Sequence, residues 1–140
     1  MTTEEEVYAA LKYRVVVDAA GTRRYYNDAG QLHREDGPAV ENTIFKKWYQ
    51  NGQLHRKDGP AIERMDGNNY WYQNGSLHRV NGPAVEFSNG DREWWVHGML
   101  HRVGGPAVER RNSDYRWAIN GLMYTRPGYY NQLKALGLAK

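Results

Sequence analysis

One eleven-residue motif occurs four times in this chain, and it constrains the fold more than any other feature. Its first copy reads Gln-Leu-His-Arg-Glu-Asp-Gly-Pro-Ala-Val-Glu at residues 31–41, and near-copies begin at Gln53, Ser76 and Met99. The histidines of the four copies stand 22, 23 and 23 residues apart. A fixed period of this length is typical of repeat proteins, in which one small unit cannot bury its own apolar face and must stack on its neighbours. The sequence therefore predicts one elongated array of repeats.

Composition narrows the class of protein. The 140 residues have the length of one domain, and without Cys the chain can form no disulfide, thiol nucleophile or thiolate metal site. No apolar run approaches the roughly 20 residues that cross a bilayer, and the acidic start Met-Thr-Thr-Glu-Glu-Glu differs from a secretory signal, so we expect a soluble, cytoplasmic protein. The net charge of +3 is too small for a dedicated nucleic-acid binder unless the charge is segregated on one face.

Each repeat is expected to contain two strands and a turn-rich connection. An extended Ala-Val-Glu segment leads to a turn, Asp66-Gly67 in one copy and Asn89-Gly90 in the next, and such dipeptides predict tight hairpins because both turn positions take positive φ. The second strand ends in paired side chains, with one of each pair expected on either face. These pairs are Tyr25-Tyr26, Trp48-Tyr49, Trp71-Tyr72, Trp94-Trp95 and Trp117-Ala118. A three-stranded repeat, which would form a solenoid, is the alternative.

The connection carries Leu-His-Arg and ends in Gly-Pro-Ala. Proline lacks a backbone donor and is tolerated at the first position of a strand, where we expect the four repeat prolines. They are Pro38, Pro60, Pro83 and Pro106.

The two ends of the array differ from its middle. Residues 1–12 predict a short helical cap, and Val16-Val17-Asp18 stands where later copies carry Ala-Val-Glu, which indicates a half repeat. At the other end, residues 126–140 predict a helix with Pro127 in its first turn, an apolar face of Tyr129, Leu133 and Leu136, and Gly137 at its end. This helix is expected to cover the last sheet edge.

The expected fold is therefore mainly β: an elongated, twisted antiparallel sheet of stacked hairpin repeats of about 23 residues, with a short N-terminal and a C-terminal capping helix. We expect one repeat domain over residues 1–140, with a half repeat and four hairpin repeats in residues 13–125.

Residues 71–86, Trp-Tyr-Gln-Asn-Gly-Ser-Leu-His-Arg-Val-Asn-Gly-Pro-Ala-Val-Glu, resemble MORN-type repeats, in particular bacterial and phage variants with a (Trp/Tyr)-Tyr-x-Asn-Gly-x-Leu-His-Arg-x-Asp-Gly-Pro-Ala motif. The resemblance covers about residues 15–125 and implies a sheet of successive hairpins. Related arrays are often labelled antitoxin-like, and MORN-like proteins serve as scaffolds, membrane-apposed adaptors and partner-neutralising proteins, so the resemblance implies binding without specifying the partner. The Leu-His-Arg and Gly-Pro-Ala elements depart from the eukaryotic pattern, and we expect no membrane binding.

The repeated arginines have two interpretations. With the neighbouring indole rings they could bind a nucleotide or another phosphorylated ligand, and a flexible single-stranded nucleic acid is a further alternative. We favour a structural role, in which each Arg pairs with the repeat glutamate and each His caps the Asp-Gly-Pro turn, because a stacking unit must satisfy the same buried polar groups in every copy. The residues concerned are Arg34, Arg56, Arg79, Arg102, Trp48, Trp71 and Trp94.

Metal binding and continuous duplex binding are not expected. Equivalent histidines in adjacent hairpins lie two strand spacings apart, roughly 9.6 Å. Zinc requires its imidazole ligands about 2 Å from one ion, so a column at this spacing forms no metal site. Sheet twist would rotate the column by roughly 45° per repeat, so a straight duplex would not meet all four arginines.

Positions where the copies differ are the better candidates for partner recognition, because a partner that binds one place must read an irregularity. Exposed aromatic and Arg side chains are also favoured in binding hot spots. The candidates are Phe45, Lys46, Lys47, Trp95, His97, Arg110, Arg111 and Arg116.

An enzyme is not expected. The chain has no Cys, its serines are Ser76, Ser88 and Ser113, and no Gly-rich phosphate loop joins a strand to a helix. Catalysis needs unlike groups converging in one pocket, whereas this pattern distributes like groups along a sheet. We therefore predict a non-enzymatic protein without cofactor that binds and neutralises a macromolecular partner, most simply another protein, in an antitoxin-like or phage counter-defence role.

Overall fold

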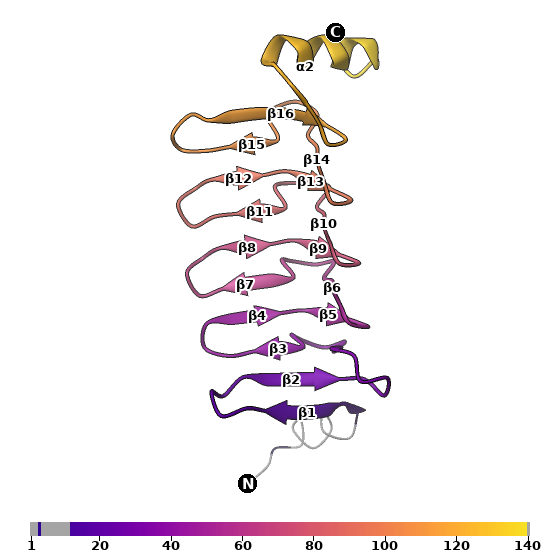
Figure 1. Ribbon diagram of the computed structural model, residues 1–140, viewed down its shortest axis with the longest axis vertical. Coiled ribbons are helices and arrows are strands. Elements are labelled where there is room, and N and C mark those ends of the chain that lie inside the picture. The colour runs from indigo at the N-terminus through magenta and orange to yellow at the C-terminus, as the bar shows by residue number, and fades with distance from the viewer. Residues whose placement is uncertain (1–2, 4–11, 140) are drawn as a thin grey trace.

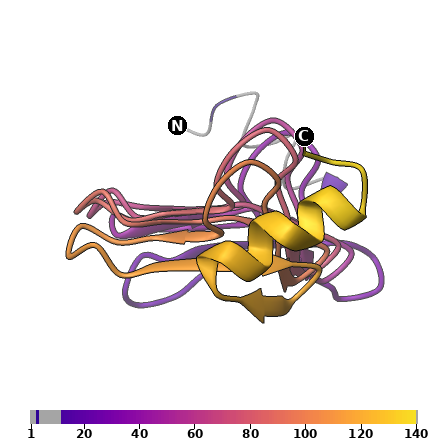
Figure 2. The ribbon, with the colours of Figure 1, turned by 90° about the horizontal axis from the view of Figure 1, so that it is seen from above.

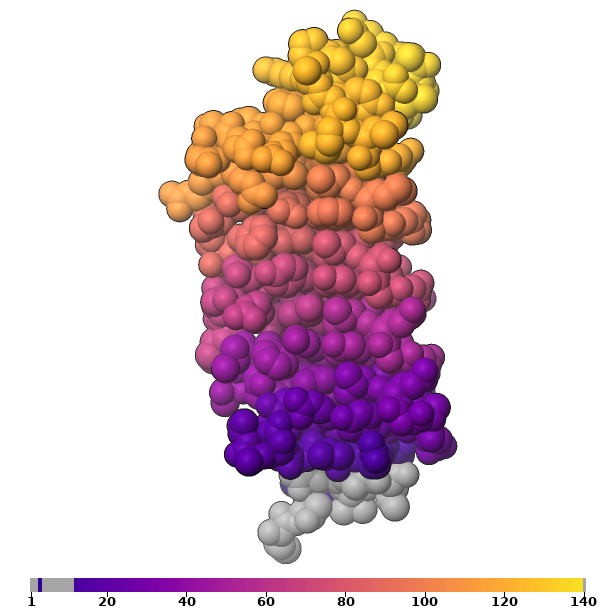
Figure 3. Space-filling model, in the orientation of Figure 1, coloured from indigo at the N-terminus to yellow at the C-terminus, as the bar shows by residue number. Residues whose placement is uncertain are grey.

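The computed structural model describes residue 3 and residues 12–139, and in it the chain forms one long antiparallel sheet that ends in a helix (Figure 1). Apart from Thr3 and Lys12, the helix expected over residues 1–12 lies outside the described residues. Figure 3 shows the resulting shape, an elongated body in which successive repeats form successive layers. The predicted mainly β array of stacked hairpins with a C-terminal helix is confirmed.

Five hairpins build the main sheet. They are β1 (Arg14–Val17) with β2 (Arg23–Tyr26), β3 (Val40–Glu41) with β4 (Phe45–Lys47), β7 (Ile62–Arg64) with β8 (Asn69–Tyr70), β11 (Val85–Glu86) with β12 (Arg92–Glu93), and β15 (Val108–Glu109) with β16 (Tyr115–Ile119). The strand β17 (Leu122–Tyr124) pairs with the second half of β16 and is last in the order. Each full repeat thus contributes two strands to the main sheet, as expected.

The second, third and fourth connections each begin with a second, smaller hairpin, which the two-strand prediction did not include. The small hairpins are β5 (Tyr49–Gln50) with β6 (Gln53–Leu54), β9 (Tyr72–Gln73) with β10 (Ser76–Leu77), and β13 (Trp95–Val96) with β14 (Met99–Leu100). Their first strands continue β4, β8 and β12 after one intervening Trp. The small hairpins do not extend the main sheet, so the array remains a row of hairpins.

The tight turns with two positive φ angles lie in the small hairpins and not where they were predicted. Gly67 and Gly90 have φ of +91° and +95°, but Asp66 and Asn89 do not take positive φ, so that prediction is wrong. In the small hairpin formed by β9 and β10 both turn residues take positive φ, Asn74 at +50° and Gly75 at +80°. These angles fit the type I′ turn, which suits the twist of a two-residue hairpin.

The two faces of the sheet carry different side chains. The register places Val40, Lys47, Ile62, Tyr70, Val85, Glu93, Val108 and Arg116 in one row. Because side chains alternate along a strand, Tyr49, Tyr72 and Trp95 lie on the same face as this row, and we call it the tyrosine face. The opposite face, with Trp48, Trp71 and Trp94, is covered by the Leu-His-Arg connections and is called the loop face. The two predicted aromatic columns are therefore present.

The prolines do not begin the strands as expected. Each lies two residues before its strand, and the alanine between them is fully buried. The alanine carbonyl accepts a hydrogen bond from the preceding repeat's aromatic residue, as at Trp71 N–H to Ala84 O, 2.7 Å. The Gly-Pro-Ala segment is thus a joint between repeats.

The first hairpin is the expected half repeat, displaced by one residue. Val16 pairs with Arg24, and Arg24 pairs with Val40, so Val15-Val16-Val17 stands where later copies have Ala-Val-Glu.

The helix α2 (Arg126–Ala135) closes the array as predicted. Thr125 is its N-cap, Pro127 lies in its first turn, and Gly137 follows its end with φ of +73°. Tyr129 and Leu133 are buried against Ile119, but Leu136 is exposed and does not join that face.

Figure 2, which looks along the stack, shows the hairpin tips of the middle repeats almost over one another, with the Leu-His-Arg connections rising on one side. The middle repeats are therefore stacked with little rotation between them, in contrast to the twist expected of the sheet. Equivalent strands of these repeats lie nearly over one another. No helix among the described residues is long and apolar enough to cross a membrane.

Candidate functional site

The repeated arginines lie inside the array as structural joints. The guanidinium carbon of Arg79 is 4.0 Å from the centroid of the Trp71 ring, and the group donates to Pro83 O over 3.1 Å. It also pairs with Glu86, 3.4 Å away, which is the predicted pairing. Arg34, Arg56 and Arg102 repeat this arrangement with Glu41, Glu63 and Glu109 at 3.6, 2.8 and 2.8 Å.

The position of each guanidinium also explains why the residue before Pro-Ala is a glycine in every copy. A Cβ on Gly82 would lie 2.9 Å from the guanidinium carbon of Arg79, and Gly37, Gly59 and Gly105 have the same neighbour at 2.8–3.0 Å. Each guanidinium thus lies between an aromatic ring, Tyr25 for Arg34 and a Trp for the other three, and the glycine Cα. A phosphate that bound these arginines would lie beside the negatively charged glutamate that already pairs with each of them, so the geometry does not favour the ligand-binding interpretation.

The histidines join consecutive repeats through a different bond from the one expected. His55 Nδ1 accepts from the backbone N–H of Asn74, 3.0 Å away in the next type I′ turn, and does not cap the Asp-Gly-Pro turn. His33, His78 and His101 make the same bond at 2.9 Å to residues 51, 97 and 120. Since Nδ1 accepts, the proton of each neutral ring belongs on Nε2. No group of three or more metal-ligand side chains is found among the described residues.

One of these joints contains two imidazoles. His97 replaces the turn asparagine, takes φ of +49°, and its ring centroid lies 4.4 Å from that of His78. Burial, with a smaller contribution from His97, lowers the pKa of His78. The turn position of this repeat therefore places a second imidazole beside a buried histidine.

The candidate residues on β4 lie at the edge formed by the hairpin tips. Lys46 is exposed, but the ammonium of Lys47 lies 4.3 Å from the Phe45 ring centroid and is half-buried, so one lysine and not two is fully exposed. Met65 N–H donates to Ile44 O across the two neighbouring tips. Ile44, Phe45 and Met65 form an apolar cluster there, which we call the tip patch.

Trp95 and Arg110 are bound into one network on the tyrosine face. The indole Nε1–H of Trp95 donates to Glu93 over 2.9 Å, and Arg110 Nη2 lies 3.4 Å from the other oxygen of the same carboxylate. Arg110 also lies 3.7 Å from Asp91 and 3.9 Å from Asp114. The positive charge of Arg110 is therefore balanced within the fold.

The remaining basic candidates are more exposed. Arg116 pairs with Asp114 at 3.3 Å, and among the described residues no carboxylate pairs with Arg111. Phe45, Lys47, Trp95, Arg110 and Arg116 share the tyrosine face, whereas Lys46 points to the loop face. Lys47 and Arg116 are separated by six strand spacings, roughly 29 Å, so the candidates do not form one compact site.

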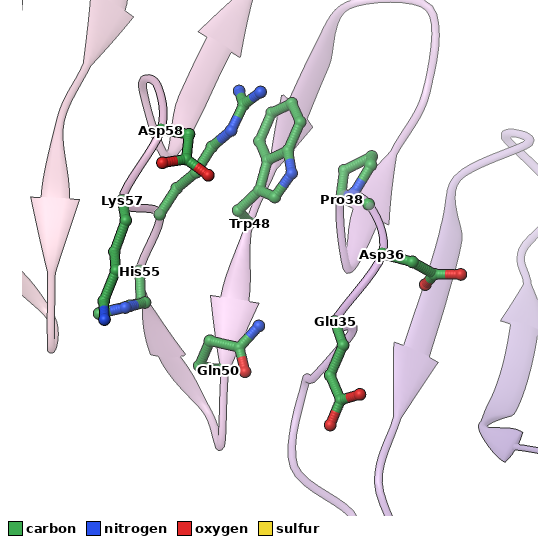
Figure 4. Close-up of a pocket in the computed structure, with 10 residues that line it drawn as sticks. Glu35, Asp36, Pro38, Trp48, Gln50, His55, Lys57 and Asp58 are labelled. Atoms are coloured by element: carbon green, nitrogen blue, oxygen red, sulfur yellow. The ribbon is translucent and has the colours of Figure 1, made fainter.

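The loop face has a row of equivalent hollows, one for each repeat. Figure 4 shows the first, in which Trp48 lies between the connections of two repeats, with Glu35, Asp36 and Pro38 on one side and His55, Lys57 and Asp58 on the other. Its volume is about 670 Å³. Gln50 closes it by donating to Arg34 O over 2.8 Å.

The third of these hollows differs in chemistry, and its lining residues were not predicted from the sequence. Val96 replaces the glutamine at position 50, and Val80 and Val103 replace the charged residues Glu35 and Lys57. Val80 is 75% exposed and Val103 is 47% exposed. The signal was present in the residue after each Leu-His-Arg, which changes from Glu and Lys to Val in the last two copies.

No known protein family, curated protein or solved structure matches the chain. The resemblance to MORN-type repeats therefore stays a prediction.

Proposed function

We propose that this protein is a non-enzymatic binding protein whose partner is another protein. The observation that supports it most is the contrast between repeated and unrepeated residues. The repeated Arg, Trp and Glu side chains contact one another within a repeat, and each repeated His accepts a hydrogen bond from a backbone N–H of the next turn. Large apolar side chains are left exposed where the copies differ, with Met65 at 80% and Ile44 at 56%. Clustered exposed apolar groups mark interaction sites on proteins.

The arrangement favours a protein over the other predicted partners. A nucleotide or a single nucleic-acid strand needs free cations beside accessible rings, whereas the four joint arginines already pair with glutamates. Neutralisation of the partner, in the antitoxin-like or counter-defence role, rests on the resemblance alone and is part of the proposal.

Affinity capture with tagged protein from cell lysate, followed by mass spectrometry, tests the function. We expect one protein in near-stoichiometric amount with the wild type and at least a tenfold lower yield with the double variant Ile44→Ser, Met65→Ser, since hot-spot truncation costs roughly 2 kcal/mol or more. Val17→Ser, at another exposed position, is the matched control and should keep the yield. Failure to enrich any protein would refute the proposal, and equal yields from both variants would exclude the tip patch as the contact.

A further inference from the structure

Five Asn-Gly dipeptides occur in the chain, and they differ in how the fold holds them. An asparagine before a glycine is prone to deamidation, because the glycine has no side chain to keep its backbone nitrogen away from the asparagine amide carbon. All five asparagines are exposed, so access to water does not distinguish them. They are Asn51, Asn74, Asn81, Asn89 and Asn120.

Three of these dipeptides form the two-residue turns of β5–β6, β9–β10 and β16–β17, with positive φ at both residues. In each turn the glycine N–H donates to a leucine carbonyl of the preceding repeat. The bond from Gly75 N–H to Leu54 O is 2.9 Å long, and Gly52 and Gly121 make equivalent bonds over 2.8 Å. The nitrogen that would attack the asparagine is therefore bound across a repeat boundary.

The fourth dipeptide, Asn89-Gly90, lies at a hairpin tip and is bound within it. Gly90 N–H donates to Phe87 O over 2.9 Å, and Asn89 Oδ1 accepts from Asp91 N–H over 2.9 Å. Both the attacking nitrogen and the side-chain amide that it would attack are thus held by hydrogen bonds.

The fifth dipeptide, Asn81-Gly82, is not held in this way. Among residues 12–139, Gly82 N–H has no acceptor and the Asn81 side chain has no hydrogen-bond partner. Asn81 lines both the second and the third hollow of the loop face. The Arg79 guanidinium lies against the Gly82 Cα, where its charge stabilises the negative charge that develops when the Gly82 nitrogen attacks.

We propose that Asn81 is a deamidation site, and that it reacts faster in the folded protein than the other four Asn-Gly asparagines. The Gly82 nitrogen forms a bond to Asn81 Cγ, the bond from Cγ to the side-chain nitrogen breaks, and ammonia leaves with the proton of Gly82 N–H. Water then opens the five-membered succinimide at one of its two carbonyls, giving aspartate or isoaspartate. Water is the only co-reactant, and the reaction is independent of the proposed binding function.

The two products differ in their effect on the joint. Aspartate gives this copy the Asp-Gly-Pro sequence of the first two copies, in which Asp36 pairs with Arg34 at 3.2 Å, so it fits the fold. Isoaspartate adds one carbon to the backbone before Gly82 and displaces the Cα against which the Arg79 guanidinium lies. Both products add a negative charge to the two hollows that Asn81 lines.

Incubation of the full chain at mildly alkaline pH, followed by peptide mapping with mass spectrometry, tests the site. Trypsin with glutamyl endopeptidase separates all five asparagines, since cleavage after Glu86 divides the tryptic peptide that contains Asn81 and Asn89. We expect Asn81 to react at least about fivefold faster than the others, because each of their attacking nitrogens must first lose a hydrogen bond.

The same incubation in guanidinium chloride is the matched control, because unfolding removes these hydrogen bonds and should remove the difference in rate. A rate at Asn81 no higher than that at Asn89 in the folded protein would overturn the proposal. A difference that persists in the denaturant would overturn it too, since the fold would then not be its cause.

Two variants provide a second readout, the release of ammonia. Asn81→Gln should abolish the fastest phase of release, since glutamine would have to form a six-membered ring and cyclises far more slowly. Asn89→Gln, at another exposed position, should keep that phase. Fast release that is unchanged in Asn81→Gln would contradict the proposal.

The effect on the joint is tested with the two products. The variant Asn81→Asp should unfold at the wild-type temperature, whereas the isoaspartyl form, purified after incubation, should unfold at a lower temperature. Equal melting temperatures of these two forms would refute the effect of isoaspartate on the joint.

Discussion

The Nδ1 atom of His78 accepts a hydrogen bond from the backbone N–H of His97, 2.9 Å away, across the boundary between two repeats. The bond requires the unprotonated nitrogen, because a protonated Nδ1 becomes a donor facing another donor. His97 lies 4.4 Å away between ring centroids, so a second charge there would add repulsion. The boundary between these repeats is therefore sensitive to protonation.

Stability should fall as the pH falls through the ordinary histidine pKa of 6.5. Burial lowers the pKa of native His78, so the unfolded chain binds more protons in this window and is favoured by acid. The stabilisation is fully present above pH 6.5 and is lost as the pH drops towards the lowered native pKa. Urea denaturation between pH 8 and pH 5 would measure this loss.

The variant His78→Asn isolates this contribution. Its Oδ1 can accept from His97 N–H and does not titrate, so the fall in stability over this pH range should become smaller than in the wild type. A pH dependence identical to that of the wild type would assign the effect to other groups.

Replacement of Arg79 by Lys should destabilise the fold by about 1–3 kcal/mol. A lysine ammonium cannot stack flat on Trp71 while also donating to Pro83 O and pairing with Glu86. Arg64→Lys is the control, because Arg64 is exposed and, among residues 12–139, pairs only with the nearby Asp66, 3.1 Å away. Chemical denaturation should place the control within about 0.5 kcal/mol of the wild type. A larger loss of stability for Arg64→Lys than for Arg79→Lys would contradict the structural role of Arg79.

Gly82→Ala should cost about 1–3 kcal/mol, because its Cβ would lie 2.9 Å from the guanidinium carbon of Arg79. The cost should depend on that neighbour. In an Arg79→Ala background the same change should become nearly neutral, and the double-mutant cycle measures the coupling between them. Additive costs would show that the glycine is needed for another reason.

Tyr129→Phe should destabilise the protein by about 1–3 kcal/mol, since it removes the hydroxyl that joins Gly104 N–H to Arg102 O in a buried setting. Tyr130→Phe is the matched control on the same helix, with an exposed ring. Thermal denaturation of both variants checks the difference, and equal losses would argue against the closing role of Tyr129.

Much of the fold follows from patterns that act over short distances. The 22- and 23-residue spacing predicts hairpin repeats, the paired aromatics predict a column on each face, and Pro127 with Gly137 predicts the last helix. The pairing of Arg79 with Glu86 could also be predicted from the sequence, because both residues belong to one motif that occurs four times. The positive-φ turns were misplaced because such dipeptides occur at a hairpin tip and in a small hairpin of the same repeat, as with Asp66-Gly67 and Asn74-Gly75, and local chemistry does not distinguish them.

The candidate sites were only partly predictable. Phe45 and Trp95 stand out because they interrupt a repeat, but the contribution of Ile44 and Met65 needs two hairpin tips to lie side by side. The third hollow of the loop face, around Trp94, was not predicted, since Val80, Val96 and Val103 come from separate segments and line one space only in the folded chain.

The array, its period, its end helix and its Arg–Glu joints can be read from the chain alone, because repeated side chains face the same local environment in every copy. The partner of each histidine, the charge balance of Arg110 and the hydrogen bond from the Tyr129 hydroxyl to Arg102 O needed the folded arrangement. Those contacts join residues 17 to 27 positions apart. Whether such residues meet depends on the strand spacing and on the path of each connection, which no local pattern specifies.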